Sequence, residues 1–313
     1  MKLLSFFKKH WFKILSVILI CAISFYVLTF GIKKARNYEI LKGDDKQQTI
    51  YTVWHVETFE GGGKARIDYL KTIARDMEKQ DNQVLFMIKQ IQPEKLSAEL
   101  EVSQPDIISF GFGVGELVLP YLIAQENTFN VRDELIESGS FNKQFYAVPY
   151  IVSGYAMFNH SMDATEFHVG TNDYIKPENI YSSLNLQPKE NETQYEAYKD
   201  FVYNKKVSLL GTGRDLFRIN NLNNIGRTNA IINPIDTYTD LIQYLGIINS
   251  NKTTQKFLSL ALSDNYQNTL SDYSLFSSKY NKIYNSGIYN DMEDAIMSCH
   301  IPNVFAAPQH LIV

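Results

Sequence analysis

Two kinds of side chain in this sequence could together hold a polar solute: aromatic rings that stack and charged groups that form hydrogen bonds. Small-molecule sites combine apolar and aromatic walls with a few fixed polar groups. Glu57 follows a β-branched and aromatic run, and Phe112 lies between two glycines just after another such run. We expect the ligand-binding residues to be Glu57, Phe112, Tyr150, Arg214, Tyr238 and Asp240.

Several of these residues also have a structural interpretation. The chain has 19 Phe and 20 Tyr, so most of its aromatic side chains must belong to the core or the surface. Glu57 lies beyond the end of a predicted strand and fits a solute contact as well as a structural partner. Arg214 follows two glycines and fits a ligand contact as well as an ion pair. Asp106 starts a predicted strand, which favours a capping role over a binding role.

Motifs for other chemistry are incomplete. Gly111-Phe-Gly-Val-Gly115 has Glu116 where a dinucleotide-binding loop needs its third glycine. Ser153-Gly154 lacks the first glycine of a nucleophile elbow. The six histidines and two cysteines show no metal-binding spacing. We therefore expect no catalytic residue, no metal and no cofactor. A carboxylate pair for glycoside hydrolysis stays open, because any two carboxylates could meet in space.

The N-terminal segment has the pattern of a membrane anchor. Residues Ile14 to Ile32 carry no charge, and at about 1.5 Å per residue they would span a hydrocarbon core of about 30 Å. Basic residues follow at 33–36, which is typical of a membrane stop and not of a cleavage site. Cys21 is preceded by Ile20, which disfavours lipid modification. We expect an uncleaved single-pass anchor at 1–36, a stalk at 37–48 and the body on the extracellular face.

Composition restricts the partners of the body. The net charge of the 313-residue chain is -4, which gives no basic surplus for nucleic acid. Cys21 and Cys299 are the two cysteines, so no disulfide framework is expected. We expect a monomer.

Periodicity predicts an α/β sheet in the first half of the body. Strands and helices alternate, which implies parallel strands with ligands beyond their carboxyl ends. The expected strands are 49–54, 84–91, 106–110, an extended run at 145–158, 206–210 and 230–234, and the expected helices are 64–79, 93–100 and 253–262.

Several stretches, taken in order, carry a resemblance to a known family. They are Val53–Phe59, Gln104–Phe110, Phe145–Tyr155, Ser208–Arg214 and a helical region at 237–247 followed by 255–258, 267 and 276–277. This series resembles the extracellular solute-binding proteins of ABC importers, the maltose-type or family 1 proteins. It covers nearly all of residues 50 to 285.

The resemblance implies a periplasmic-binding-protein-like type II fold, with two α/β lobes joined by a hinge. Lobe 1 would comprise 49–148 and 237–286, and lobe 2 would comprise 149–236 and 287–313. The implied function is to bind a carbohydrate and deliver it to the permease subunits of an ABC transporter, without catalysis. A surface sensor or scaffold with the same fold is the alternative, and a cell-surface glycoside hydrolase is a less favoured one.

Overall fold

The computed structural model describes residues 48–59, 64–126, 129–160, 166–169, 194–203, 207–279, 284 and 287–307, with a few positions between 11 and 26. The chain divides into two compact units, Met1–Gln48 and Thr49–Val313. Most of the predicted anchor at 1–36 and nearly all of the stalk at 37–48 lie outside the described residues. Where the chain is described, no helix has the length and apolar character needed to cross a membrane.

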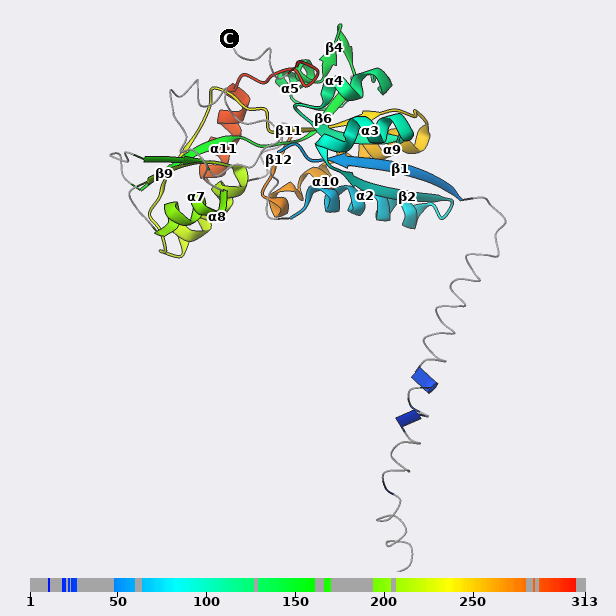
Figure 1. Ribbon diagram of the computed structural model, residues 1–313, viewed down its shortest axis with the longest axis horizontal. Helices are drawn as coiled ribbons and strands as arrows, with labels where there is room; N and C mark the ends of the chain where they lie inside the picture. The colour runs from blue at the N-terminus through cyan, green and yellow to red at the C-terminus, as the bar shows by residue number, and fades with distance from the viewer. Residues whose placement is uncertain are drawn as a thin grey trace, which may run out of the picture. The chain divides into compact units, whose positions relative to one another are not determined.

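The second unit is built on a six-stranded sheet with strand order β12-β6-β11-β3-β1-β2. The strands β1 (Thr49–Val56), β2 (Val84–Ile91) and β3 (Ile107–Gly111) run parallel, as predicted. They are connected by α2 (Arg66–Gln80), η1 (Pro93–Lys95) and α3 (Leu96–Val102). The apolar residues of α2 recur every three or four positions and are buried, at Ile67, Leu70, Ile73, Ala74 and Met77. Figure 1 shows α2 and α3 on opposite sides of β1.

The other half of this sheet is antiparallel. Strand β11 (Ile242–Ile247) pairs with β3 and with β6 (Ala147–Val152), and β12 (Phe276–Ser277) pairs with β6. The prediction of a helical region over 237–247 is therefore wrong, because residues 242–247 form a strand. Every residue of β11 is buried, because a strand in the middle of a sheet is covered on both faces. This burial removes the apolar–polar alternation that would have identified the strand.

A smaller, four-stranded sheet has the order β10-β7-β9-β8. Its strands are β7 (Tyr155–Asn159), β8 (Glu166–Val169), β9 (Val207–Thr212) and β10 (Ile231–Pro234). Helices α7 (Gln194–Tyr203), α8 (Gly213–Asn224) and α11 (Gly287–Ser298) contact strands of this sheet. The carboxylate of Asp215 accepts from the backbone N–H of Thr212 (3.3 Å), one half of a capping box, and α8 starts directly at the end of β9.

Short elements complete the second unit. They are α4 (Gly115–Val118), η2 (Leu119–Tyr121), α5 (Asp133–Ser138), β4 (Ser140–Phe141), β5 (Gln144–Phe145), α9 (Lys252–Ala261), α10 (Asp264–Gln267) and η3 (Leu270–Tyr273). Helix α9 follows the prediction for 253–262, and its Asn251 cap accepts hydrogen bonds from Thr253 and Thr254.

Three chain segments pass between the two sheets and are hydrogen-bonded to one another. Ser153 N donates to Leu241 O (2.8 Å), and Thr239 Oγ1 donates to Ser153 O (2.8 Å). Thr239 N donates to His300 O (3.1 Å), which joins the third segment to the second. We refer to residues 152–155, 235–241 and 299–302 as the crossing segments. A few adjacent extended segments of this kind are what a hinge between two lobes requires.

The two sheets divide the strands near the boundaries that the sequence predicts for the lobes. The larger sheet takes its strands from 49–152 and 242–277, and the smaller from 155–234. The end of the described chain returns toward the larger sheet, since Val304 N donates to Ser138 O (2.8 Å) and the ring of Phe305 lies 6.4 Å from that of Phe110. The division into lobe 1 (49–148, 237–286) and lobe 2 (149–236, 287–313) stays a prediction.

Candidate functional site

The carboxyl ends of β1 and β3 lie against each other. A Cβ atom on Gly111 would stand 2.2 Å from Thr58 Oγ1 and 3.1 Å from the carbonyl oxygen of Ile242, so any larger residue here would force the Thr58 side chain to move. Glu57 and Phe112 follow these ends, which is where ligands bind in open α/β sheets.

Three side chains contact the carboxylate of Glu57, and 30% of the Glu57 side-chain surface is exposed. Its Oε1 lies 3.1 Å from His55 Nε2 and 3.6 Å from Arg66 Nε. Gln90 Nε2 donates to the other oxygen at 3.1 Å. Burial alone would raise the pKa of Glu57, but the hydrogen bond with His55 and the charge of Arg66 outweigh it and lower the pKa to about 2. Glu57 is therefore an ionised acceptor at neutral pH.

A buried network extends from Glu57 into the sheet. Burial lowers the pKa of His55, so its ring is neutral. Because ionised Glu57 only accepts, His55 Nε2 carries the proton and Nδ1 accepts from Ser109 Oγ (2.9 Å). Ser109 Oγ then accepts from Tyr150 Oη and from Gln243 Nε2, both at 2.9 Å. Tyr150 is fully buried, and its hydroxyl group is part of this network.

Ser109, His55 and Glu57 have the residue types of a nucleophilic triad but not its accessibility. Ser109 and His55 have no exposed surface. The hydroxyl oxygen of Ser109 already accepts two hydrogen bonds, so no substrate could approach it. This trio holds Glu57 in place and does not form a nucleophile.

Phe59 and Arg66 form a second wall beside Glu57. The guanidinium carbon of Arg66 lies 4.0 Å from the centre of the Phe59 ring, and its Nη2 donates to the carbonyl of Phe59. Phe59 belongs to a small apolar cluster, separate from the main core, that also contains Tyr155, Leu210, Ile235, Tyr238 and Leu241. These residues come from β7, β9 and a crossing segment, so the end of β1 meets the smaller sheet here.

Asp240 lies in the same crossing segment as Tyr238. Its carboxylate accepts from Tyr155 Oη at 2.8 Å and from Tyr238 Oη at 3.4 Å. Burial raises the pKa of Asp240 to about 6, although the bond from Tyr155 opposes the shift. Two aromatic hydroxyls and one carboxyl group therefore meet where the chain passes between the sheets.

Arg214 is buried in the first turn of α8 and pairs with Asp215 at 3.2 Å. The preceding residue, Gly213, donates its N–H to the carbonyl of Gly154 in the first crossing segment (3.0 Å), so this turn of α8 lies beside that segment. Phe112 is 4% exposed at the end of β3.

The predicted residues thus fall into groups. Glu57 belongs to the same network as Tyr150, and Asp240 is bonded to Tyr238, while Phe112 and Arg214 stand at separate strand ends. Their convergence on one solute stays a prediction. Sequence reasoning missed His55 and Arg66. The spacing of His55 and Glu57, two apart near a strand end, puts both on one side of the strand and could have identified His55.

Comparison with known proteins was made on sequence and on structure. No family model matches the sequence, and no curated protein matches it. Solved structures match at low identity: the GacH receptor of Streptomyces glaucescens GLA.O has a TM-score of 0.59 at 12% identity, covering 84% of this chain and 90% of the receptor. A Thermotoga lettingae ABC transporter solute-binding protein bound with α-D-tagatose has a TM-score of 0.58 at 12% identity, covering 84% and 92%. The maltose-maltodextrin binding protein of Alicyclobacillus acidocaldarius has a TM-score of 0.55 at 12% identity, covering 84% and 94%. The chain therefore has the α/β fold of the sugar-binding solute-binding proteins of ABC transporters, as the sequence resemblance implied.

Proposed function

We propose that this protein is a membrane-tethered extracellular solute-binding protein that takes a carbohydrate between two lobes and delivers it to an ABC permease. The observation that carries the proposal is the small cluster where Phe59 and Arg66 meet Tyr155 and Tyr238. It combines aromatic rings with two carboxyl groups, those of Glu57 and Asp240, next to the crossing segments. The similar structures include complexes with acarbose, maltotriose and tagatose.

The cluster is suited to open. Its six buried apolar residues are separate from the main core, so parting the lobes would expose the rings of this cluster and leave the sheets intact. A sugar ring could then stack on Phe59 or Tyr155, while the exposed part of Glu57 accepts from its hydroxyl groups. Closure about the crossing segments would bury the solute.

Charge favours a neutral solute over an anionic one. The ionised carboxylate of Glu57 lies beside Arg66 at the edge of the cluster, with 30% of its side chain exposed. An anion brought against it would be repelled, whereas a hydroxyl group would donate to it.

A thermal-shift titration of the full chain with maltotriose, mannobiose and tagatose tests the proposal. A sugar at one hundred times its dissociation constant adds about 2.7 kcal/mol of stability and raises the melting temperature. Glu57→Gln should weaken binding of that sugar at least about tenfold, or about 1.4 kcal/mol. Glu99→Gln, which alters an ion pair with Lys89 away from the cluster, is the matched control. Equal binding by both variants, or no shift with any sugar, contradicts the proposed site.

A further inference from the structure

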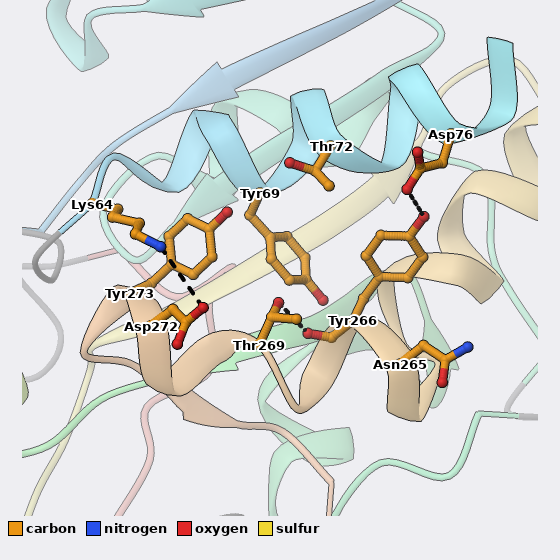
Figure 2. A pocket seen from close by; sticks show the side chains of 9 residues that line it. All are labelled: Lys64, Tyr69, Thr72, Asp76, Asn265, Tyr266, Thr269, Asp272 and Tyr273. Carbon is orange, nitrogen blue, oxygen red and sulfur yellow. Dashed lines mark hydrogen bonds and ion pairs between the residues drawn. The ribbon is translucent and has the colours of Figure 1, made fainter. Parts of the chain in front are cut away.

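A second feature with the chemistry of a binding site lies between α2 and the segment α10–η3. It is a groove of about 420 Å³, within the range of about 300–1,000 Å³ that small-molecule sites occupy. None of its lining residues belongs to the candidate site. They are Lys64, Tyr69, Thr72, Asp76, Asn265, Tyr266, Thr269, Asp272 and Tyr273. Figure 2 shows three tyrosine rings in a row along it, with Lys64 and Asp272 at one end and Asp76 and Asn265 at the other.

The aromatic floor of the groove is rigid. The rings of Tyr266 and Tyr273 meet the ring of Tyr69 edge-on, with centres 6.3 and 5.9 Å apart. Tyr69 itself is buried, donates to the carbonyl of Ala261 (2.6 Å) and accepts from Gln267 Nε2 (3.2 Å). These fixed contacts set the rings in place before any ligand arrives, which lowers the entropy that binding would cost.

The charged groups of the groove are already paired. Lys64 Nζ lies 3.7 Å from Asp272 and 5.3 Å from the centre of the Tyr273 ring. Asp76 accepts from Tyr266 Oη at 2.9 Å and from Lys79 at 2.7 Å. These pairs are exposed and oppose a charged ligand only weakly, whereas a neutral ligand leaves them in place.

The other groups of the rim suit a ligand rich in hydroxyl groups. Thr72, Thr269 and Asn265 are exposed at the groove. The hydroxyl groups of Thr72 and Thr269 donate to the carbonyls of Asp68 (2.8 Å) and Tyr266 (2.7 Å), so they offer acceptors, while the amide of Asn265 offers both donors and an acceptor. The ring of Tyr266 is half-buried, whereas Tyr69 and Tyr273 are buried, so Tyr266 supplies the aromatic surface that a ligand could reach. Such a ring, flanked by neutral hydrogen-bonding groups, matches a sugar ring, which has apolar C–H faces and a polar edge.

We propose that this groove is a second binding site, for a neutral carbohydrate unit. The site needs neither lobe closure nor any residue of the candidate site, so it goes beyond the proposed function. Two sites on one chain would allow an oligosaccharide long enough to reach both to bind at each, and binding at one would raise its effective concentration at the other.

The test is fluorine NMR of the full chain labelled with 3-fluorotyrosine, titrated with maltotriose and with mannobiose. Tyr266→Phe and Tyr273→Phe assign the two groove signals by their loss. We expect one of the sugars to shift both signals, with the same affinity in Glu57→Gln. Thr72→Trp, at an exposed position that would fill the groove, should weaken this response at least tenfold. Ser259→Trp, an exposed position on α9 outside the groove, should leave it unchanged.

Three outcomes are decisive. If neither sugar shifts the signals of Tyr266 and Tyr273, the second site is overturned, even where Glu57→Gln abolishes sugar binding elsewhere. An equal response in Thr72→Trp and the parent chain also overturns it. A groove response that Thr72→Trp removes, with no binding sensitive to Glu57→Gln, supports the second site and counts against the proposed function alone.

Discussion

Burial makes the contribution of Asp240 to folding stability depend on pH. Its pKa is about 6 in the folded protein, against a reference value of 3.8. A carboxyl group with a raised folded-state pKa contributes stability that is full below the unfolded pKa and is lost as pH rises through the folded one. The contribution of Asp240 should therefore be present below about pH 4 and disappear by about pH 6 to 7.

Asp240→Asn should remove this dependence. The variant should be more stable than the parent chain at pH 7.5, by at most about 3 kcal/mol for a shift of about two pKa units. Urea denaturation at pH 4.5 and 7.5 measures it. Asp236→Asn, at an exposed carboxylate in the same crossing segment, is the control. Equal pH dependence in Asp240→Asn and the parent chain would contradict the assignment.

Ser109 connects three buried partners, so its removal should be costly. Ser109→Ala takes away the hydrogen-bond partner of His55 Nδ1 and of Tyr150 Oη, both fully buried. Each buried polar group that loses its partner costs about 1–3 kcal/mol, so for these two groups we expect a loss of about 2–6 kcal/mol in the free energy of unfolding. Ser259→Ala, which removes an exposed hydroxyl bonded only to a helix carbonyl, should change stability by less than about 0.5 kcal/mol. A loss in Ser109→Ala as small as that of the control would show that the network is not formed.

Sequence reasoning reached some of these residues and not others, for a physical reason. Glu57 was predicted because it follows a strand end, and this depends only on local pattern. Its partner Arg66 begins helix α2 nine positions later, and only the fold brings its guanidinium to 3.6 Å from Glu57. The burial of Tyr150 likewise depends on Tyr69, 81 positions earlier in the sequence, whose ring stacks on it.

At the scale of elements, local pattern was informative where one face of an element is exposed. Helix α2 shows a clear apolar stripe, and β2 was predicted with its observed bounds. Strand β11 was missed because it is buried on both faces and its pairing with β3 joins residues more than 130 positions apart. Its place in the sheet is set by non-local contacts that no window of sequence contains.

The segment at 301–307 is held on α4 by close packing, and Gly115 tests this placement. A Cβ atom on Gly115 would stand 2.0 Å from the carbonyl oxygen of Val304. Gly115→Ala must therefore push that segment away, and we expect a loss of about 1–3 kcal/mol in the free energy of unfolding. Gly287→Ala, where a Cβ atom meets no atom of the described residues within 4 Å, should be neutral or slightly stabilising. Equal melting temperatures for the two variants would mean that 301–307 does not pack there.

At the scale of the whole body, a buried ion pair links parts of the chain that the sequence assigns to different lobes. Arg132, at the start of α5, lies 3.3 Å from Glu293 on α11, and neither side chain is more than 4% exposed. Arg132 also donates from Nε to the carbonyl of Lys279 (3.0 Å), next to β12, whereas α11 contacts β10 of the smaller sheet. The pair therefore spans from the region of one sheet to the region of the other.

Removing one partner should cost more than removing both. Arg132→Met leaves the Glu293 carboxylate buried without its cation, and such losses are about 3–5 kcal/mol. In Arg132→Met/Glu293→Leu the desolvated charge is gone, so much of that stability should return, and a double-mutant cycle by urea denaturation measures the coupling. If the pair also helps to hold the lobes together, the double variant should bind sugar with altered affinity at the candidate site, because the energy needed to open or close the hinge has changed. Additive losses in the cycle would show that the two side chains act independently and that the link between the lobes lies elsewhere, in the hydrogen bonds of the crossing segments.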